Sequence, residues 1–442
     1  MRASLLITTF LAYSVTASAG GIDWHPWSDA VFAQARHEHK FVLLDLEAVW
    51  CHWCHVMDQT TYRDPTVTAL VQTKYIAVKV DRDSRPDISN RYEDYGWPAT
   101  VVFGPDGKEI VKRQGYFKPD EMASMPRAIV KDPSPGPSVE PQKALKLGPT
   151  SRLTPELRAE LQRRFEASYD SKHGGWGADR KYLDWNCAEY AMLLARAGDR
   201  HAEHMARETL AQQRKLIDPV WGGVYQYSVG GDWDQPHFEK IMAFQANDLR
   251  IYALAYQQWN DPAYLQSARD IAKYLRNFLT SPDGAFYTSQ NADLIDGKHS
   301  ADYFKLDDAA RRKQGIPRID RHRYARENGW AITAFATLYK VTKERTDLDA
   351  AVRAANWVIA NRALPGGGFR HDEADAGGPY LDDTLAMGRA FLAFVRCDRR
   401  TCIVEARLGR GAILPHKLPR CRSWICDRKI DRGSALRAGS GA

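Results

Sequence analysis

Residues 24–130 show short apolar runs separated by amphipathic stretches, a pattern typical of alternating strands and helices. Residues 28–40 carry apolar side chains at helical spacing and predict a helix, and a second helix is expected directly after residue 51. The apolar runs predict strands at 41–47, 75–80, 100–103 and 109–112. This alternation predicts a small α/β domain.

A longer helical region follows a proline-rich stretch. Residues 131–150 contain five prolines, which predict a stiff, extended linker. From residue 155 to residue 394 long helical periods dominate. We place the helices at 155–169, 183–197, 200–217, 239–258, 262–279, 326–342, 347–362 and 380–395.

Glycine followed closely by an aromatic residue recurs between these helices. The motifs are Gly174-Gly-Trp176, Gly222-Gly-Val-Tyr225, Gly284-Ala-Phe-Tyr287 and Gly366-Gly-Gly-Phe369. A helix pair with a glycine-rich turn, repeated along the chain, predicts stacked helical hairpins.

The first 19 residues have the three parts of an export signal. Arg2 precedes an apolar run from Leu5 to Val15, and Ala17-Ser-Ala19 follows as a cleavage site. The run is too short to span a bilayer comfortably, and no other stretch approaches ~20 apolar residues. We therefore expect a signal peptide at 1–19, no membrane span after its cleavage, and an exported protein, periplasmic or secreted, in which disulfides persist.

The composition is that of an ordinary globular protein, and its basic charge is local. The chain has 442 residues, 26% of them charged, with a net charge of +7. Residues 396–442 alone carry a net charge of +8 and four of the seven cysteines. Because the other residues sum to −1, the charge does not indicate a nucleic-acid partner.

The most informative segment is residues 50–55, which read Trp-Cys-His-Trp-Cys-His. It follows a predicted strand and begins a predicted helix, where backbone amides and the helix dipole stabilise a thiolate on Cys51. Cys54 lies one turn on and can close a disulfide with Cys51, and a charged His52 would favour the thiolate further. This arrangement favours thiol–disulfide exchange.

Three other interpretations of this segment stay open. Cys-x-x-Cys-His is also the attachment pattern of c-type haem. Cys51, Cys54 and a histidine are possible zinc ligands, although no second ligand pair lies nearby. The pair is also compatible with an inert structural disulfide.

Two further positions support the redox interpretation. Asp45 lies in the apolar strand before Cys51, where a buried carboxylate can accept and return the proton of the resolving thiol. Pro98 follows Trp97 at the start of a strand and is a candidate cis-proline that presents backbone to an extended peptide, although the sequence alone favours a simple strand-edge proline.

These residues resemble known proteins at two levels. Asp45-x-x-Ala-x-Trp50-Cys51-x-x-Cys54 with Trp97-Pro98 resembles thioredoxin. The longer strings Cys51-His-Trp-Cys-His-Val-Met57, Val80-Asp-Arg-Asp-x-Arg-Pro-Asp87 and Pro236-His-Phe-Glu-Lys240 are similar to the spermatogenesis-associated protein 20 family.

The resemblance covers about residues 22–395. It implies an α/β thioredoxin-like domain at 22–130, followed after the linker by an all-α (α/α) toroid of the six-hairpin glycosidase type at 151–395. A complete toroid would need twelve helices, and the sequence predicts about eight. We therefore expect the toroid to be incomplete at its C-terminal end.

In a toroid, polar residues after the glycine-aromatic turns are expected to meet at one mouth. The main candidates are Trp233, Asp234, His237, Glu239 and Asp293; Asp184, Glu327, Asn328, Asp382 and Asp383 are further ones. Two carboxylates across a pocket hydrolyse glycosidic bonds, and a histidine can transfer a proton in an epimerisation. First-turn acids that only complement a helix dipole would show the same pattern.

The sequence thus predicts an exported thioredoxin-like protein whose catalytic residues are Cys51, Cys54, Asp45, Pro98, His52 and Trp50. No phosphate-cradling glycine loop is present, so we expect no cofactor, and no metal is assigned. The expected partner is a protein or small-thiol redox partner, with a toroid that binds a partner or a carbohydrate-like ligand. The alternatives are a carbohydrate-active enzyme with a structural thioredoxin-like domain and a non-catalytic binding protein.

The basic, cysteine-containing tail at 396–442 breaks the helical period and does not resemble the family. We hypothesise that it is an aberrant end that replaces the last hairpins. In that case the toroid is open and exposes apolar surface.

Overall fold

The predicted strands form one mixed sheet in the computed structural model, which describes residues 21–139 and 153–397. Within these residues the sheet has the order β1-β3-β2-β4-β5. The strands are β1 (Trp24–His25), β2 (Phe41–Glu47), β3 (Tyr75–Asp81), β4 (Ala99–Phe103) and β5 (Glu109–Gln114). β1, β3 and β2 are parallel, whereas β4 runs antiparallel to β2 and β5 antiparallel to β4.

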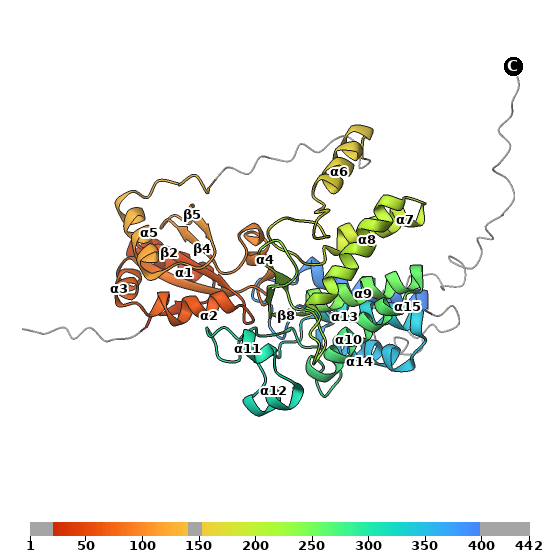
Figure 1. The fold of residues 1–442 in the computed structure, drawn as a ribbon. Coiled ribbons are helices and arrows are strands. Elements are labelled where there is room, and N and C mark those ends of the chain that lie inside the picture. The colour runs from red at the N-terminus through yellow and green to blue at the C-terminus, as the bar shows by residue number, and fades with distance from the viewer. Residues whose placement is uncertain (1–20, 140–152, 398–442) are drawn as a thin grey trace, which may run out of the picture. The chain divides into compact units, whose positions relative to one another are not determined.

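Alternation along β2 directs its side chains to two separate cores. Val42 and Leu44 pack in a core with α1 (Asp29–Glu38) and α4 (Pro86–Ser89). Leu43 packs on the opposite face, where the core includes side chains of the remaining helices of this region. These helices are α2 (His52–Gln59), α3 (Pro65–Lys74) and α5 (Pro119–Lys131). Asp45 shares this second face by its period of two. The strands and helices of this region run from red to orange in Figure 1.

Part of the predicted linker is attached to the sheet. The Gly136 amide donates to the Ile110 carbonyl at 2.8 Å, and the Lys112 amide donates to the Ser138 hydroxyl at 3.0 Å. Residues 132–139 therefore follow β5, while the linker from residue 140 lies outside the described residues.

The second half of the chain is largely helical and agrees closely with the helical periods of the sequence. Its long helices are α6 (Pro155–Ala167), α7 (Trp185–Arg196), α8 (Arg200–Gln213), α9 (Met242–Trp259), α10 (Pro262–Phe278), α13 (Ala325–Thr342), α14 (Arg345–Arg362) and α15 (Leu381–Cys397). The shorter elements are β6 (Tyr227–Ser228), β7 (Pro236–His237), β8 (Lys240–Ile241), β9 (Ser289–Gln290), α11 (Ala301–Phe304), α12 (Asp308–Gln314) and β10 (Ile319–Asp320).

The long helices stack as hairpins. α7 packs on α8, α9 on α10, and α13 on α14, while α7, α9, α13 and α15 contact one another in sequence as a row. This two-layer row is the arrangement expected for part of an α/α toroid. The predicted fold class, a thioredoxin-like α/β domain followed by a helical hairpin region, is therefore confirmed.

The glycine-aromatic motifs occupy equivalent turns of this row. Each closes with a short β-bridge after a helix: Tyr169 with Trp176, Ile217 with Val224, Thr280 with Phe286, and Ala363 with Phe369. Glycine is required where the chain passes closest to the next helix. A Cβ on Gly222, whose φ is +75°, would lie 2.1 Å from the Asp270 carbonyl oxygen.

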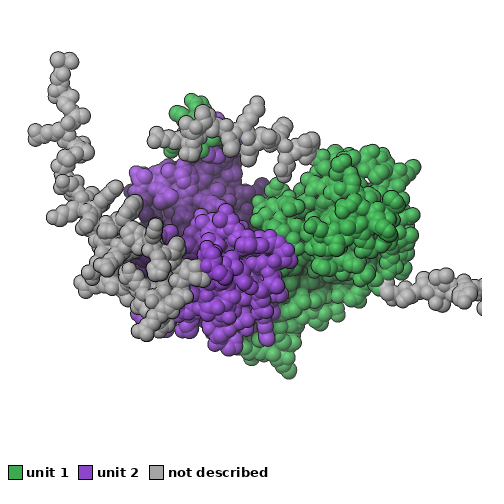
Figure 2. Space-filling model, turned by 180° about the vertical axis from the view of Figure 1, so that it is seen from behind, with its two compact units in different colours: residues 1–159, 290–318 green, residues 160–289, 319–442 purple. Residues whose placement is uncertain are grey.

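The chain folds into two compact units, shown in different colours in Figure 2. Unit 1 contains residues 1–159 and 290–318, and unit 2 contains residues 160–289 and 319–442. The sequence placed 290–318 within the helical toroid, whereas this segment leaves unit 2 after β9, packs in unit 1 and returns at β10.

Two predictions concern residues beyond those described. The signal peptide at 1–19 and the tail from residue 398 lie outside the described ranges, so both stay predictions. Within residues 21–139 and 153–397, no helix is both long enough and apolar enough to cross a membrane.

Candidate active site around the Cys51–Cys54 disulfide

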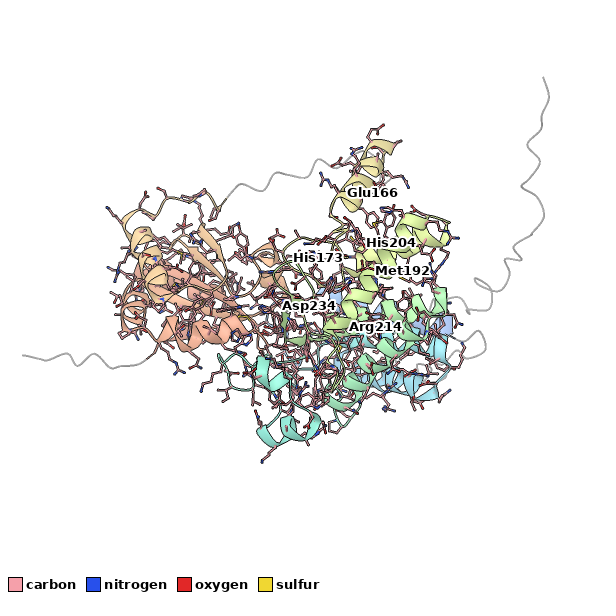
Figure 3. The ribbon with its side chains drawn as sticks, in the orientation of Figure 1. Glu166, His173, Met192, His204, Arg214 and Asp234 are labelled. Carbon is pink, nitrogen blue, oxygen red and sulfur yellow. A yellow bond between two sulfur atoms is a disulfide. The ribbon has the colours of Figure 1, made fainter. Side chains whose placement is uncertain are left out.

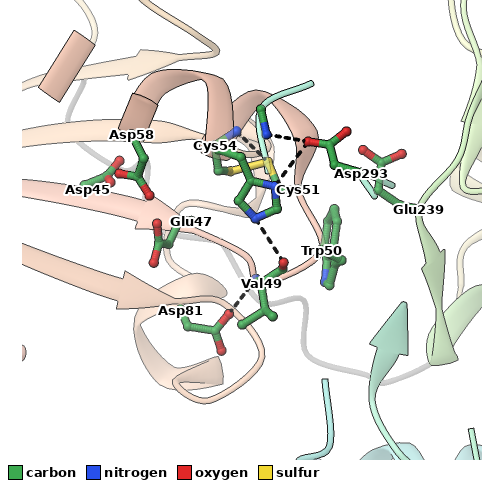
Figure 4. The surroundings of a disulfide bond; sticks show 12 residues. Asp45, Glu47, Val49, Trp50, Cys51, Cys54, Asp58, Asp81, Glu239 and Asp293 are labelled. Atoms are coloured by element: carbon green, nitrogen blue, oxygen red, sulfur yellow. Dashed lines mark hydrogen bonds and ion pairs between the residues drawn. A yellow bond between two sulfur atoms is a disulfide. The ribbon is translucent and has the colours of Figure 1, made fainter. Parts of the chain in front are cut away.

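Cys51 and Cys54 form a disulfide at the start of α2, as the sequence predicts. Their Cα atoms are 5.3 Å apart, within the normal range for a disulfide. Cys51 is the N-cap of α2, and the Cys54 amide donates to the Cys51 sulfur at 3.2 Å (Figure 4). Because the first amides of a helix have no partner within the helix, they stabilise negative charge on that sulfur after reduction.

Two aspartates, one at the end of β3 and one just after it, hold the loop in front of Cys51. The Trp50 indole donates to Asp83 at 2.8 Å, and the Val49 amide donates to Asp81 at 3.2 Å. Trp50 is buried. Trp50 therefore positions the dithiol loop, which gives a structural reason for the acidic string after β3.

Asp45 is buried beside a lysine and two more acids. The Lys79 ammonium lies 3.5 Å from Asp45, 2.9 Å from Glu47 and 2.5 Å from Asp58. Burial raises the pKa of Asp45 to about 7, although the Lys79 charge opposes this shift. A carboxyl that titrates near neutral pH is suited to exchange a proton with a thiol.

The same three acids could also ligate a cation, since their oxygens lie within 4.8 Å of one another. Lys79 already places its ammonium among them. Burial lowers the pKa of Lys79, but attraction by Asp45, Glu47 and Asp58 outweighs burial and raises it. Lys79 thus supplies the positive charge that this acidic group needs.

A carboxylate from far along the chain contacts both histidines of the dithiol helix. His52 Nδ1 lies 2.7 Å from Asp293 Oδ1, and His55 Nδ1 lies 3.4 Å from Asp293 Oδ2. All three residues belong to unit 1, because residues 290–318 pack there (Figure 4). The assignment of Asp293 to a toroid pocket is therefore corrected: the segment that carries it folds back onto α2.

Pro98 has the cis peptide bond that the sequence allowed for, and it is buried. Its carbonyl accepts a hydrogen bond from the Gly115 amide at 2.8 Å.

The Arg82 guanidinium lies 4.3 Å from the centre of the Trp97 ring and 5.9 Å from the centre of the Trp50 ring. Trp53 is exposed and packs on Tyr116. Aromatic and cationic side chains thus pack beside the segment that carries the dithiol.

The contacts of His55 bear on the haem and zinc interpretations. Its Nε2 lies 3.1 Å from the Val49 carbonyl oxygen and 3.3 Å from Arg318 Nη2, while its Nδ1 faces Asp293. Both ring nitrogens therefore have partners within the chain. The two sulfurs are bonded to each other. This geometry favours a dithiol site over haem attachment or a zinc centre.

The residues predicted for a toroid pocket do not all meet. Trp233 is buried, and its indole donates to the His173 carbonyl at 2.8 Å, so it packs a turn instead of facing a mouth. Asp234, labelled in Figure 3, is 64% exposed and pairs with Lys215 at 3.1 Å. His237 and Glu239 are neighbours, with 3.9 Å between Nδ1 and Oε2.

Unit 2 also contains a buried charged group that the sequence reasoning only partly identified. His371 Nδ1 lies 2.8 Å from Asp383 Oδ1. Burial alone would lower the pKa of His371, but Asp383 and Glu327 attract its proton and raise the pKa above the ordinary value. Asp383 and Glu327 were among the further candidates, whereas His371 was missed. Its position in an irregular loop gave no periodic signal.

Comparison with known proteins gives one match to the N-terminal region and longer matches that extend beyond it. A family model named Thioredox_DsbH, described as a protein of unknown function, DUF255, matches residues 4–131. Human spermatogenesis-associated protein 20 is 26% identical over 308 residues, covering 62% of this chain and 39% of that protein. The chain is similar to spermatogenesis-associated protein 20 over this range. The resemblance predicted from the motifs is thus confirmed.

Other relatives extend this picture. The uncharacterized protein B0495.5 of Caenorhabditis elegans is 26% identical over 63% of this chain and 42% of its own length. The chain therefore spans about two fifths of the length of these curated relatives. The thiol:disulfide interchange protein DsbD 1 of Pseudomonas aeruginosa is 39% identical over 85 residues, which cover 18% of this chain and 14% of that protein.

Solved structures similar to this chain include helical glycoside enzymes. A family 76 glycoside hydrolase, the alpha-mannanase BT2949 of Bacteroides thetaiotaomicron, has a TM-score of 0.41 at 14% identity, covering 56% of this chain and 63% of its own. Cellobiose 2-epimerase from Bacillus thermoamylovorans has a TM-score of 0.40 at 11% identity, covering 55% and 67%.

Proposed function

We propose that this protein catalyses thiol–disulfide exchange through Cys51 and Cys54. The observation that carries the proposal is the position of Cys51 at the N-cap of α2, where the Cys54 amide donates to its sulfur. The short matches to DsbD proteins support it, since those proteins are named thiol:disulfide interchange proteins.

In the reducing direction, the Cys51 thiolate attacks one sulfur of a substrate disulfide, forms a mixed disulfide and releases the other sulfur as a thiolate. The Cys54 thiol then loses its proton and attacks Cys51, which releases the second substrate thiolate and forms the Cys51–Cys54 disulfide. Two electrons pass from the dithiol to the substrate. Asp45 is our candidate acceptor for the Cys54 proton. A protein dithiol or a small thiol must reduce the pair again.

The test is trapping of the mixed disulfide. We expect Cys54→Ser to accumulate a mixed disulfide on Cys51 with a peptide disulfide, and Cys51→Ser to accumulate none. Mass mapping assigns the modified sulfur. Cys187 should not interfere, because burial and the nearby Asp184 raise the pKa of its thiol to about 12. If neither variant changes exchange activity, the proposal is wrong.

We also propose that the exchange takes place outside the cytoplasm. The support is the N-terminal pattern of Arg2, the apolar run and Ala17-Ser-Ala19. Cell fractionation with N-terminal sequencing of the mature protein tests this. A cytoplasmic product that keeps residues 1–19 would contradict it.

For unit 2 we propose ligand or partner binding without turnover. The support is that two of the residues predicted for a catalytic pocket have other roles: Trp233 donates to the His173 carbonyl, and the exposed Asp234 pairs with Lys215. We expect a carbohydrate or peptide library to yield binding that survives Cys51→Ala. Turnover of a glycan that is lost in His237→Ala would instead favour the carbohydrate-active alternative.

A further inference from the structure

Asp293 is a buried carboxylate that the thiol-exchange proposal does not yet use. Its side chain is 1% exposed. Besides the two imidazoles, its Oδ2 accepts a hydrogen bond from the Gly297 amide at 2.8 Å, and its own amide donates to Asn291 at 3.0 Å. The loop around it therefore fixes the carboxylate in position. A second contact, from the Ala292 amide to the Trp50 carbonyl at 3.4 Å, joins the same loop to the residue before Cys51.

The charge of Asp293 determines which protons the imidazoles hold. Burial raises the pKa of Asp293, but hydrogen bonds from His52 and His55 outweigh burial and lower it below the ordinary range. The carboxylate is therefore ionised at neutral pH and accepts hydrogen bonds only. A close contact of 2.7 Å then requires that His52 carries its proton on Nδ1.

Other charged groups also face the two imidazoles. Asp296 lies 3.8 Å from His55 Nδ1 and is 43% exposed, and the His299 ring packs 5.5 Å from the His52 ring. Arg318 Nη2 lies 3.3 Å from His55 Nε2. His52 is the residue next to Cys51 and meets the carboxylate at the shorter distance. Its imidazole therefore links Asp293 to the first residue of α2, directly after Cys51.

We propose that Asp293 is a positioning residue for thiol exchange, which holds His52 protonated on Nδ1 and supports a positive charge beside the Cys51 thiolate. The proposal rests on the proposed function of the dithiol. It assigns to the segment 290–318 a part in the redox site, although the segment lies more than 230 positions after Cys51. The dithiol site is thus built from two distant parts of the chain.

Two opposite effects of Asp293 can be separated by the sign of one measurement. Acting through His52, the carboxylate holds the proton on Nδ1 of the imidazole next to Cys51 and makes the Cys51 thiolate more available. Acting directly on Cys51, its negative charge would make the thiolate less available. Removing the charge therefore lowers thiol reactivity in the first case and raises it in the second.

The experiment compares the reduced full-length chain with Asp293→Asn, using iodoacetamide alkylation of Cys51 between pH 5 and 9 with mass mapping. We expect the midpoint of alkylation to move to higher pH in D293N, with a loss of about tenfold in rate at pH 6 for each unit of the move. The reduction potential, measured in glutathione buffers, should fall, because a less stable thiolate disfavours the reduced dithiol.

Asp296→Asn is the matched control, because it removes a carboxylate from the same segment at a longer, more exposed position. We expect a smaller effect from D296N than from D293N. Should D293N not fold, His52→Gln tests the same route: it should lower Cys51 reactivity in an otherwise unchanged chain.

A double variant completes the test. In the His52→Gln background, D293N should no longer lower the reactivity of Cys51. Unchanged or increased reactivity in D293N alone would overturn the role of Asp293. The proposed function would stand even then, provided that Cys54→Ser still traps a mixed disulfide.

Discussion

At the scale of single residues, Asp45 gives the chain a pH-dependent stability. Burial raises its pKa to about 7 in the folded chain, against an unfolded value of about 4. Below pH 4 both states hold the proton, and as the pH rises toward 7 the unfolded state loses it first. The free energy of unfolding therefore falls across this range.

Asp45→Asn should remove this dependence. Between pH 4 and pH 8 we expect the stability of D45N relative to the native chain to rise, by on the order of a few kcal/mol, because the variant has no charge to bury. Urea denaturation at each pH measures the difference. Equal pH profiles for the two proteins would assign the dependence to another group.

Asp106, on the turn after β4, is a control because its pKa is shifted in the opposite direction from that of Asp45. Hydrogen bonds from Lys108 lower the pKa of this exposed carboxyl. Its contribution is present above the unfolded pKa and is lost as the pH falls through the folded pKa. Asp106→Asn should therefore weaken the chain slightly at neutral pH, and this effect should shrink as the pH falls through the lowered pKa of Asp106.

The two catalytic candidates illustrate what single residues reveal in a sequence. Cys51 and Asp45 were predictable because each lies in a local pattern, one at a strand-to-helix junction and the other within an apolar strand. Asp293 was assigned to the wrong unit, because its glycine-aromatic context is that of the helical hairpins. Its contacts with His52 and His55 depend on a long return of the chain, for which the sequence has no local signal.

At the scale of elements, the segment 290–318 meets α2 at a glycine. Gly297 has a φ of +78°, and a Cβ there would lie 3.2 Å from Gln59 Cγ and 3.3 Å from the His55 carbonyl oxygen. The close approach and the left-handed backbone both favour glycine.

We expect Gly297→Ala to loosen this contact. The added methyl should push the segment away from α2 and increase hydrogen–deuterium exchange of residues 291–300 and of the start of α2. Gly115→Ala is the control, since Gly115 has a similar φ of +85° and no atom within 4 Å of the added Cβ. Similar exchange in both variants would mean that backbone strain, and not the close approach, explains any change.

The accuracy of the predicted elements follows their periodicity. β2 occupies the predicted range of 41–47, and the long helices of unit 2 differ from prediction mainly at their ends. α3 and α5 were not predicted individually. α5 contains Pro126, which breaks its pattern, yet the Pro126 carbonyl accepts a hydrogen bond from Tyr75 in the core. Tertiary packing therefore overrides a weak local signal there.

At the scale of the whole molecule, the sequence predicted two regions of different texture, and the chain forms two units. What it missed is that unit 1 is not continuous: residues 290–318 leave the helical row and pack with the thioredoxin-like domain. Alternating and helical hydrophobic periods identify strands and helices. They carry no information about which distant elements of the chain pack together.

The last helix of the described row has a second apolar stripe. Ala386, Met387, Ala390 and Phe394 of α15 are buried, and α15 packs on α13. Leu381, Leu385, Leu392 and Val395 are also spaced along one helical face, but each is at least 46% exposed. A helix that covers a core from one side has a single apolar stripe, so this second one is an apolar patch on the surface.

We expect Leu385→Gln with Leu392→Gln to reduce binding of the dye ANS and concentration-dependent self-association, with a loss of less than about 1 kcal/mol in unfolding free energy. Met387→Ala on the same helix is the matched control and should cost about 2–5 kcal/mol, because Met387 is fully buried. Size-exclusion chromatography and urea denaturation measure both effects. A loss from the double variant as large as that from M387A would mean that the stripe is covered in the folded protein, and the predicted open edge of the helical row would then be wrong.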